Sequence, residues 1–146
     1  MRVRVRSLLL LLGFVMAGQL PALHAADPVP APTLDARPSD VDMFGSWTGT
    51  VTFEGASEPM DGGLITIRRT EDERLSVTVG PDSRVRYTCV RLARTDQGLR
   101  FEVSLPGEDT RLLAYDVAVD EGAMTGTVTF VSYGLTRPGR LAFARQ

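Results

Sequence analysis

Short runs of alternating apolar and polar residues, separated by turn-forming clusters, constrain the fold of this chain most strongly. From Met43 onward the runs are rich in Val, Thr, Phe, Tyr and Leu, and none keeps a helical period. Turn formers such as "DGG", "GPDS" and "DEG" separate them. The pattern predicts strands over residues 46–54, 63–70, 74–79, 84–93, 98–105, 111–119, 122–132 and 139–145. About eight strands with tight connections favour an all-β, antiparallel up-and-down meander that closes into a small barrel, with a two-sheet sandwich as the alternative.

The alternation also gives each strand an inner and an outer face. The outer face is predicted to carry threonine and charged residues, such as Thr48, Arg100 and Glu102. The inner face is predicted to form one continuous core: Trp47, Gly49, Val51, Phe53, Ile65, Ile67, Leu75, Val77, Val85, Tyr87, Cys89, Leu99, Phe101, Val103, Leu113, Tyr115, Val117, Met124, Gly126, Val128, Phe130, Leu141 and Phe143.

The hexapeptide "TGTVTF" occurs twice, at residues 48–53 and 125–130. In both copies the glycine falls on the predicted core side, where a missing side chain lets a strand bend sharply or another group approach. The threonines fall on the outer side, where β-branching favours a strand. The repeat therefore indicates that both strands bend at a core-facing glycine for the same reason, and an internal duplication is the alternative.

The first 42 residues differ from the rest in composition. Arg2, Arg4 and Arg6 precede an apolar run that ends near Met16, which is typical of a secretory signal peptide. We expect residues 1–25 to be this signal, residues 26–42 a flexible Pro-rich linker and residues 43–146 the barrel domain. The expected location is the periplasm or the extracellular space, with no membrane insertion once the signal is removed.

The remaining chain lacks many reactive side chains. Without residues 1–25 it has 13 basic and 18 acidic residues, a formal net charge of −5, and neither histidine nor lysine. This charge argues against nucleic acid and anionic membranes as partners. Catalytic triads, Schiff-base lysines and histidine-ligated metals are excluded within one chain. Cys89 is the only cysteine, so no internal disulfide forms. We expect no enzyme activity, no metal and no cofactor.

The "GSW" at residues 45–47, with "EGAMTGTVTF" at 121–130 and "GRLAFAR" at 139–145, resembles small lipocalin-like modules of exported bacterial proteins. The likeness covers most of residues 44–146. It implies a barrel in which Trp47 closes one end under an arginine of the last strand. Arg145 shares the alternation of Phe143, so the resemblance assigns this role to Arg145 as a cation–π contact.

Arg91 follows Cys89 on the predicted inner face. Either it lies at the rim of the barrel, or it marks a polar site inside, with Tyr87 and Tyr115 as companions for a small anionic ligand. The ligand-binding residues we predict are Tyr87, Arg91, Phe101 and Tyr115. The expected function is a non-enzymatic binding protein for a small molecule or an exported protein. The alternative is an inhibitor of a secreted or periplasmic hydrolase that acts through the barrel rim and the N-terminal arm.

Overall fold

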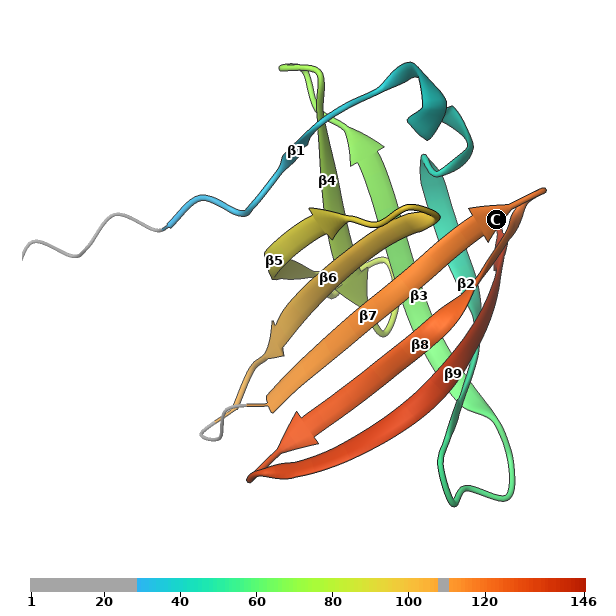
Figure 1. The fold of residues 1–146 in the computed structure, drawn as a ribbon. Coiled ribbons are helices and arrows are strands. Elements are labelled where there is room, and N and C mark those ends of the chain that lie inside the picture. Colours follow the sequence, from blue (N-terminus) through green and yellow to red (C-terminus); the bar gives the residue numbers. More distant parts are fainter. Residues whose placement is uncertain (1–28, 108–110) are drawn as a thin grey trace, which may run out of the picture.

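The computed structural model describes residues 29–107 and 111–146 and shows an all-β barrel (Figure 1). Each of its eight antiparallel strands bonds to the next in sequence, β9 returns to β2, and a pairing of β4 with β5 closes the ring. The predicted meander barrel is therefore confirmed. Its strands are β2 (Gly45–Phe53), β3 (Met60–Arg69), β4 (Arg74–Gly80), β5 (Tyr87–Arg94), β6 (Gly98–Leu105), β7 (Arg111–Asp120), β8 (Ala123–Ser132) and β9 (Leu135–Arg145).

Two short elements precede the barrel. The strand β1 (Leu34–Asp35) pairs with β4, and the 3-10 helix η1 (Pro38–Asp42) follows it. Pro38 lies in the first turn of η1, where its missing N–H removes no helical hydrogen bond. The second half of the predicted linker is thus more ordered than its proline content indicates, while the predicted signal peptide lies outside the described residues.

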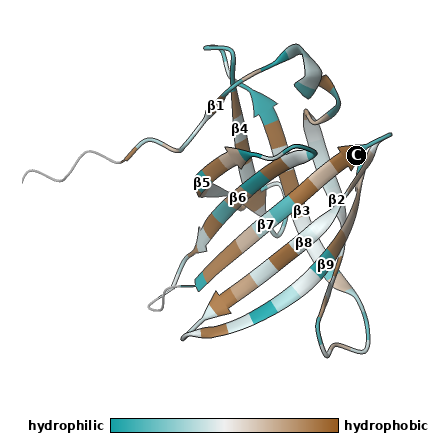
Figure 2. Cartoon of the chain, in the orientation of Figure 1, coloured by the Kyte–Doolittle hydropathy of each residue, from teal (hydrophilic) through white to brown (hydrophobic). Residues whose placement is uncertain are grey.

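The centre of the barrel is a packed core to which every barrel strand contributes, and the strands in Figure 2 alternate between apolar and polar residues accordingly. The rings of Phe101 on β6 and Tyr115 on β7 stack with centroids 4.8 Å apart. The buried core residues are Trp47, Val51, Ile65, Ile67, Leu75, Val77, Val79, Cys89, Leu99, Phe101, Val103, Tyr115, Val117, Met124, Val128, Leu141 and Phe143.

The two glycines of the repeated hexapeptide lie where an adjacent strand comes very close. A Cβ atom on Gly49 would sit 2.1 Å from the carbonyl oxygen of Ala142 on β9. A Cβ atom on Gly126 would sit 2.1 Å from the carbonyl oxygen of Asp116 on β7. No other residue fits such an approach, so in both copies of the hexapeptide the glycine is what permits the neighbouring strand to come this close.

Three strands begin three or more residues away from their predicted starts. β3 begins at Met60 rather than residue 63, and the other two differences have clear reasons. β5 begins at Tyr87 rather than residue 84 because Asp82 Oδ1 accepts the backbone N–H groups of Arg84 (2.7 Å) and Val85 (3.1 Å) and holds them in a turn. Val85, predicted to be inside, is accordingly 42% exposed. β9 begins at Leu135 rather than residue 139, with Pro138 inside the strand.

Pro138 is compatible with β9 because its missing N–H faces away from β8. The carbonyl of Pro138 accepts the N–H of Glu54 at 2.8 Å. The edge of Pro138 that would carry an N–H therefore faces the residues just after the end of β2. The last register pair of β2 and β9 is Phe53 with Gly139. A proline here therefore costs no ladder hydrogen bond.

Candidate functional site

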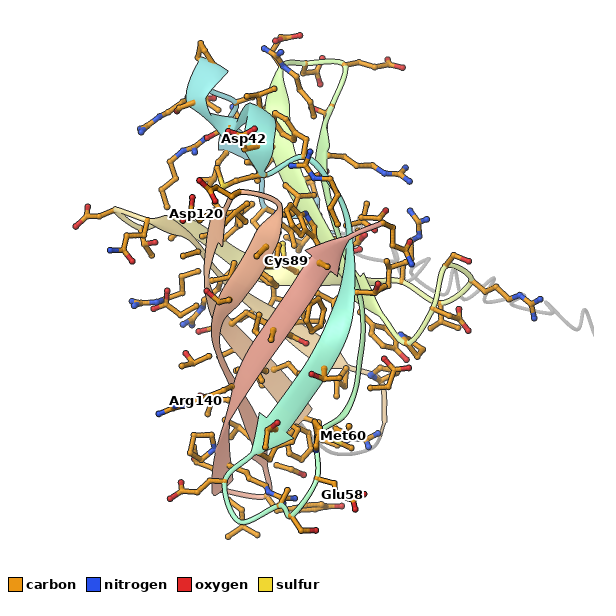
Figure 3. The ribbon with its side chains drawn as sticks, turned by 90° about the vertical axis from the view of Figure 1, so that its right-hand side faces the viewer. Asp42, Glu58, Met60, Cys89, Asp120 and Arg140 are labelled. Carbon is orange, nitrogen blue, oxygen red and sulfur yellow. The ribbon has the colours of Figure 1, made fainter. Side chains whose placement is uncertain are left out.

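One end of the barrel is closed by side chains. Trp47 is fully buried, and its indole N–H donates to the carbonyl of Met43 at 3.0 Å. The guanidinium of Arg145 lies 5.0 Å from the centroid of the Trp47 ring and donates to the carbonyl of Asp42. The contact expected between Trp47 and Arg145 is therefore present. Figure 3 shows Asp42 at this closed end.

A buried ion pair fastens the segment that precedes the barrel to the same end. Asp40 of η1 is 1% exposed and accepts two hydrogen bonds from Arg94 of β5, at 2.5 and 2.6 Å. It also accepts the backbone N–H of Arg37 at 2.7 Å. Burial alone would raise the pKa of Asp40, but these hydrogen bonds and the charge of Arg94 outweigh it and lower the pKa below its ordinary value.

The opposite end carries arginine on the inner side of the barrel. Directly opposed residues of neighbouring antiparallel strands point to the same side of the sheet. One such row runs Val103, Leu113, Phe130 and Arg137 across β6, β7, β8 and β9. Val103 is fully buried in the core, so the row faces inward, and Arg137 belongs to the inner side of this end. We call this the open end because Arg137 and Leu135, which lie here, are exposed.

The next row towards the open end lies two residues further along each strand and faces the same way. It contains Leu105, Arg111, Ser132 and Leu135. Arg111 donates from Nη2 to the carbonyl of Pro106 at 2.6 Å, while its buried Nε has no hydrogen-bond partner among the described residues. A buried donor without a partner is costly, so Arg111 has unused capacity to bind an acceptor.

Arg137 stands over an aromatic ring at this end. Its guanidinium lies 5.4 Å from the ring centroid of Phe53 on β2, and its Nε lies 3.5 Å from the carbonyl oxygen of Glu54. Apart from these two contacts, Arg137 is exposed to solvent. The open end thus combines half-buried apolar side chains (Phe53, Leu105, Leu113 and Phe130) with two inward arginines.

The structure does not gather the four predicted ligand-binding residues into one site, although Phe101 and Tyr115 stack on each other. Tyr87 is half-buried at the start of β5, and Phe101 and Tyr115 are buried within the core. Burial raises the pKa of Tyr115 to about 12. Arg91 instead lies outside the barrel, with its side chain 79% exposed and its Nε 3.5 Å from Glu102.

A bulge explains the position of Arg91. The register of β5 against β6 shifts between Cys89 and Arg91, which moves every later residue to the opposite face. Leu92 consequently takes the inner position and packs against the core. The inner polar site that Arg91 would have marked is therefore not formed by Arg91.

Arg111 and Arg137 were not among the predicted site residues, although the sequence contains a signal for both. Inner positions recur at every second residue. Counting back from Tyr115 and Leu113, the next inner position is Arg111, and counting back from Leu141 through Gly139, it is Arg137. Arg137 fell outside the predicted strand because of Pro138, and Arg111 stood at a predicted strand end.

The described residues show neither a metal-binding group nor a reactive thiol. In this part of the chain no three side chains among His, Cys, Asp and Glu are grouped as a metal ion would require. Cys89 is buried, and this burial raises the pKa of its thiol although backbone N–H groups of Val77 and Cys89 act in the opposite direction. Thiol reactivity depends on the thiolate, so Cys89 is suited to packing.

Together these features define an eight-stranded antiparallel β-barrel, consistent with a lipocalin-like barrel, with one end sealed and the other lined by apolar and cationic side chains. Comparison with protein-family models, with curated proteins and with solved structures finds no match to this chain. Among residues 29–107 and 111–146, no helix has the length and apolar character needed to span a bilayer.

Proposed function

We propose that this protein is an exported, non-enzymatic binding protein of lipocalin-like type. Its ligand is a small amphipathic anion, held at the open end of the barrel. The observation that carries this proposal is the pair of inward arginines, Arg111 and Arg137, beside half-buried apolar side chains.

The chemistry of the open end matches an anionic group attached to an apolar body. A carboxylate bound at Arg111 would satisfy its Nε, which has no partner among the described residues, and Arg137 would add a second positive charge at the same end of the barrel. The apolar part would cover Phe53 and Phe130. Since the centre of the barrel is packed, the ligand would lie near the rim rather than deep inside.

Protein inhibition has less support as a function. An inhibitory arm should project from the barrel, but β1 pairs with β4 and Asp40 is bound to Arg94. Within the part of the chain that the structure describes, Val29–Pro32 are the residues that precede these attachments.

Calorimetric titration with decanoate and with decanol tests the proposal. We expect decanoate to bind with a Kd in the micromolar range and decanol at least about 10-fold more weakly, because one charge-assisted hydrogen bond contributes about 1.5 to 3 kcal/mol. The double variant Arg111→Gln/Arg137→Gln should lose this preference.

The matched control is Arg140→Gln. Arg140 lies on β9 as well, but it is opposed to Thr127 and Thr52, belongs to the outer face and points away from the barrel in Figure 3. The control should bind decanoate as the unmodified chain does. Equal binding of decanoate by the double variant and the control would contradict the assignment.

A further inference from the structure

The junction between β4 and β5 is the weakest in the barrel. These strands share two register pairs, Thr78 with Thr88 and Val79 with Tyr87, whereas β5 and β6 share five. Beyond Thr88, the described residues contain no strand paired with β5 on the β4 side. An edge of this kind has backbone N–H and C=O groups available to another extended chain.

The segment that precedes the barrel lies in this gap. β1 pairs with the first half of β4, through Leu34 with Leu75 and Asp35 with Arg74. Before β1, residues Val29–Pro32 face Thr88–Val90 across a hollow of about 300 Å³. Figure 1 shows the chain leaving the barrel on this side.

Two prolines keep this segment from completing the sheet. Pro30 and Pro32 have no N–H group and cannot donate to a neighbouring strand, and no backbone hydrogen bond joins Val29–Pro32 to β5 in the described structure. The chain that flanks Cys89–Ala93 therefore does not pair with it and is separated from it by a hollow.

Two arginines hold β1 and its flanking residues at this junction. Arg74 donates to Thr33 Oγ1 and to Asp35 Oδ1, both at 2.7 Å. Arg94 donates to the carbonyl of Asp35 at 2.6 Å. The Asp35 side chain is 89% exposed and that of Arg74 is 43% exposed, so this ion pair is weak and open to competition.

We propose that the β4–β5 junction is an acceptor site for an extended acidic segment of a partner protein. The segment adds as a strand beside Cys89–Ala93, its backbone pairs with β5 where Pro30 and Pro32 cannot, and its carboxylate replaces Asp35 on Arg74. Residues Val29–Asp35 cover the site until they are displaced. Backbone pairing supplies affinity and the carboxylate supplies selectivity.

Synthetic peptides test this directly. The peptide VTATTLDA copies residues 29–36 with threonine in place of both prolines. It is titrated into the full chain carrying Asp35→Ala, which removes the competing carboxylate, and amide resonances are followed by NMR. We expect a Kd below about 1 mM, with the largest shifts and the strongest protection from hydrogen exchange in Cys89–Ala93.

Two further peptides separate the parts of the proposal. VPAPTLDA, with the native prolines, should bind at least threefold more weakly, as should VTATTLNA, which lacks the carboxylate. Absence of shifts in Cys89–Ala93 with VTATTLDA would overturn the acceptor site. Equal binding of VTATTLNA would overturn the acidic preference, and equal binding of VPAPTLDA would overturn strand addition.

Discussion

Replacing Asp40 by asparagine tests whether the ion pair with Arg94 holds η1 against the barrel. The substitution keeps the size of the side chain and removes its charge. Arg94 then keeps its hydrogen bond to the carbonyl of Asp35 and can donate to one amide oxygen in place of two carboxylate oxygens, while its side chain is only 17% exposed. A cation that loses its counter-charge in such a site cannot be solvated fully by water.

The structure sets the size of the effect. Breaking a buried ion pair by removing one partner costs about 3 to 5 kcal/mol. Since Arg94 retains some contact with solvent, we expect the lower end, about 3 kcal/mol, a large share of the roughly 5 to 15 kcal/mol that stabilises a typical domain. For a domain of this size the loss corresponds to a fall in Tm of roughly 12 to 24 °C.

Thermal unfolding followed by circular dichroism measures this change, and Asp42→Asn is the matched control. Asp42 belongs to the same helix but is exposed, and no ion pair of its side chain is seen in the described residues. We expect the control to change Tm by no more than about 2 °C, because exposed substitutions have small effects. Equal Tm values for the two variants would refute the reasoning.

The pH dependence of stability provides a second measurement on the same variants. The pKa of Asp40 is lower in the folded chain than its ordinary value of 3.8. The ion pair therefore contributes fully above about pH 4 and loses its contribution as the pH falls through the folded pKa. In Asp40→Asn this acid-sensitive part should be missing, whereas Asp42→Asn should retain it.

Three other experiments test the packing of the barrel: unfolding of two glycine variants, titration of Tyr115 and chemical reaction of Cys89. Gly49→Ala should destabilise the chain by about 3 kcal/mol or prevent folding, because the new Cβ would overlap the carbonyl of Ala142. Gly122→Ala, where no atom lies within 4 Å, should cost about 1 kcal/mol because of its positive φ. Urea unfolding compares the two variants. Tyr115 should ionise near pH 12 in a spectrophotometric titration, and because its pKa is raised from 10, its stabilising contribution should be full below pH 10 and be lost as the pH rises through 12. Cys89 should react with a disulfide reagent at pH 8 at least about 100-fold more slowly in the folded chain than in urea, since burial raises the pKa of its thiol and restricts access; equal rates would contradict its burial.

The alternation of the sequence was sufficient to predict the barrel because each strand has one buried face and one exposed face. It predicted Phe101 and Tyr115 correctly as core residues. It could not predict the bulge before Arg91, because a bulge depends on the partner strand and leaves no strong local pattern. The same limit applies to Asp40, whose partner Arg94 is 54 residues away in the chain.

The two ends of the barrel repeat one arrangement with different outcomes. At each end β9 places an arginine over an aromatic ring of β2: Arg145 over Trp47 and Arg137 over Phe53. At the closed end η1 supplies the carbonyl of Asp42 as an acceptor for Arg145, and the tryptophan is fully buried.

At the open end the described residues include no helix comparable to η1. Arg137 is exposed there, and the Nε of Arg111 lacks a partner in the described structure. Among the described residues, the backbone of η1 thus satisfies the cation at the closed end, whereas at the other end the Nε of Arg111 is left without an acceptor. If an anion supplies that acceptor, decanoate should raise Tm in the unmodified chain and in Arg140→Gln, but not in Arg111→Gln/Arg137→Gln.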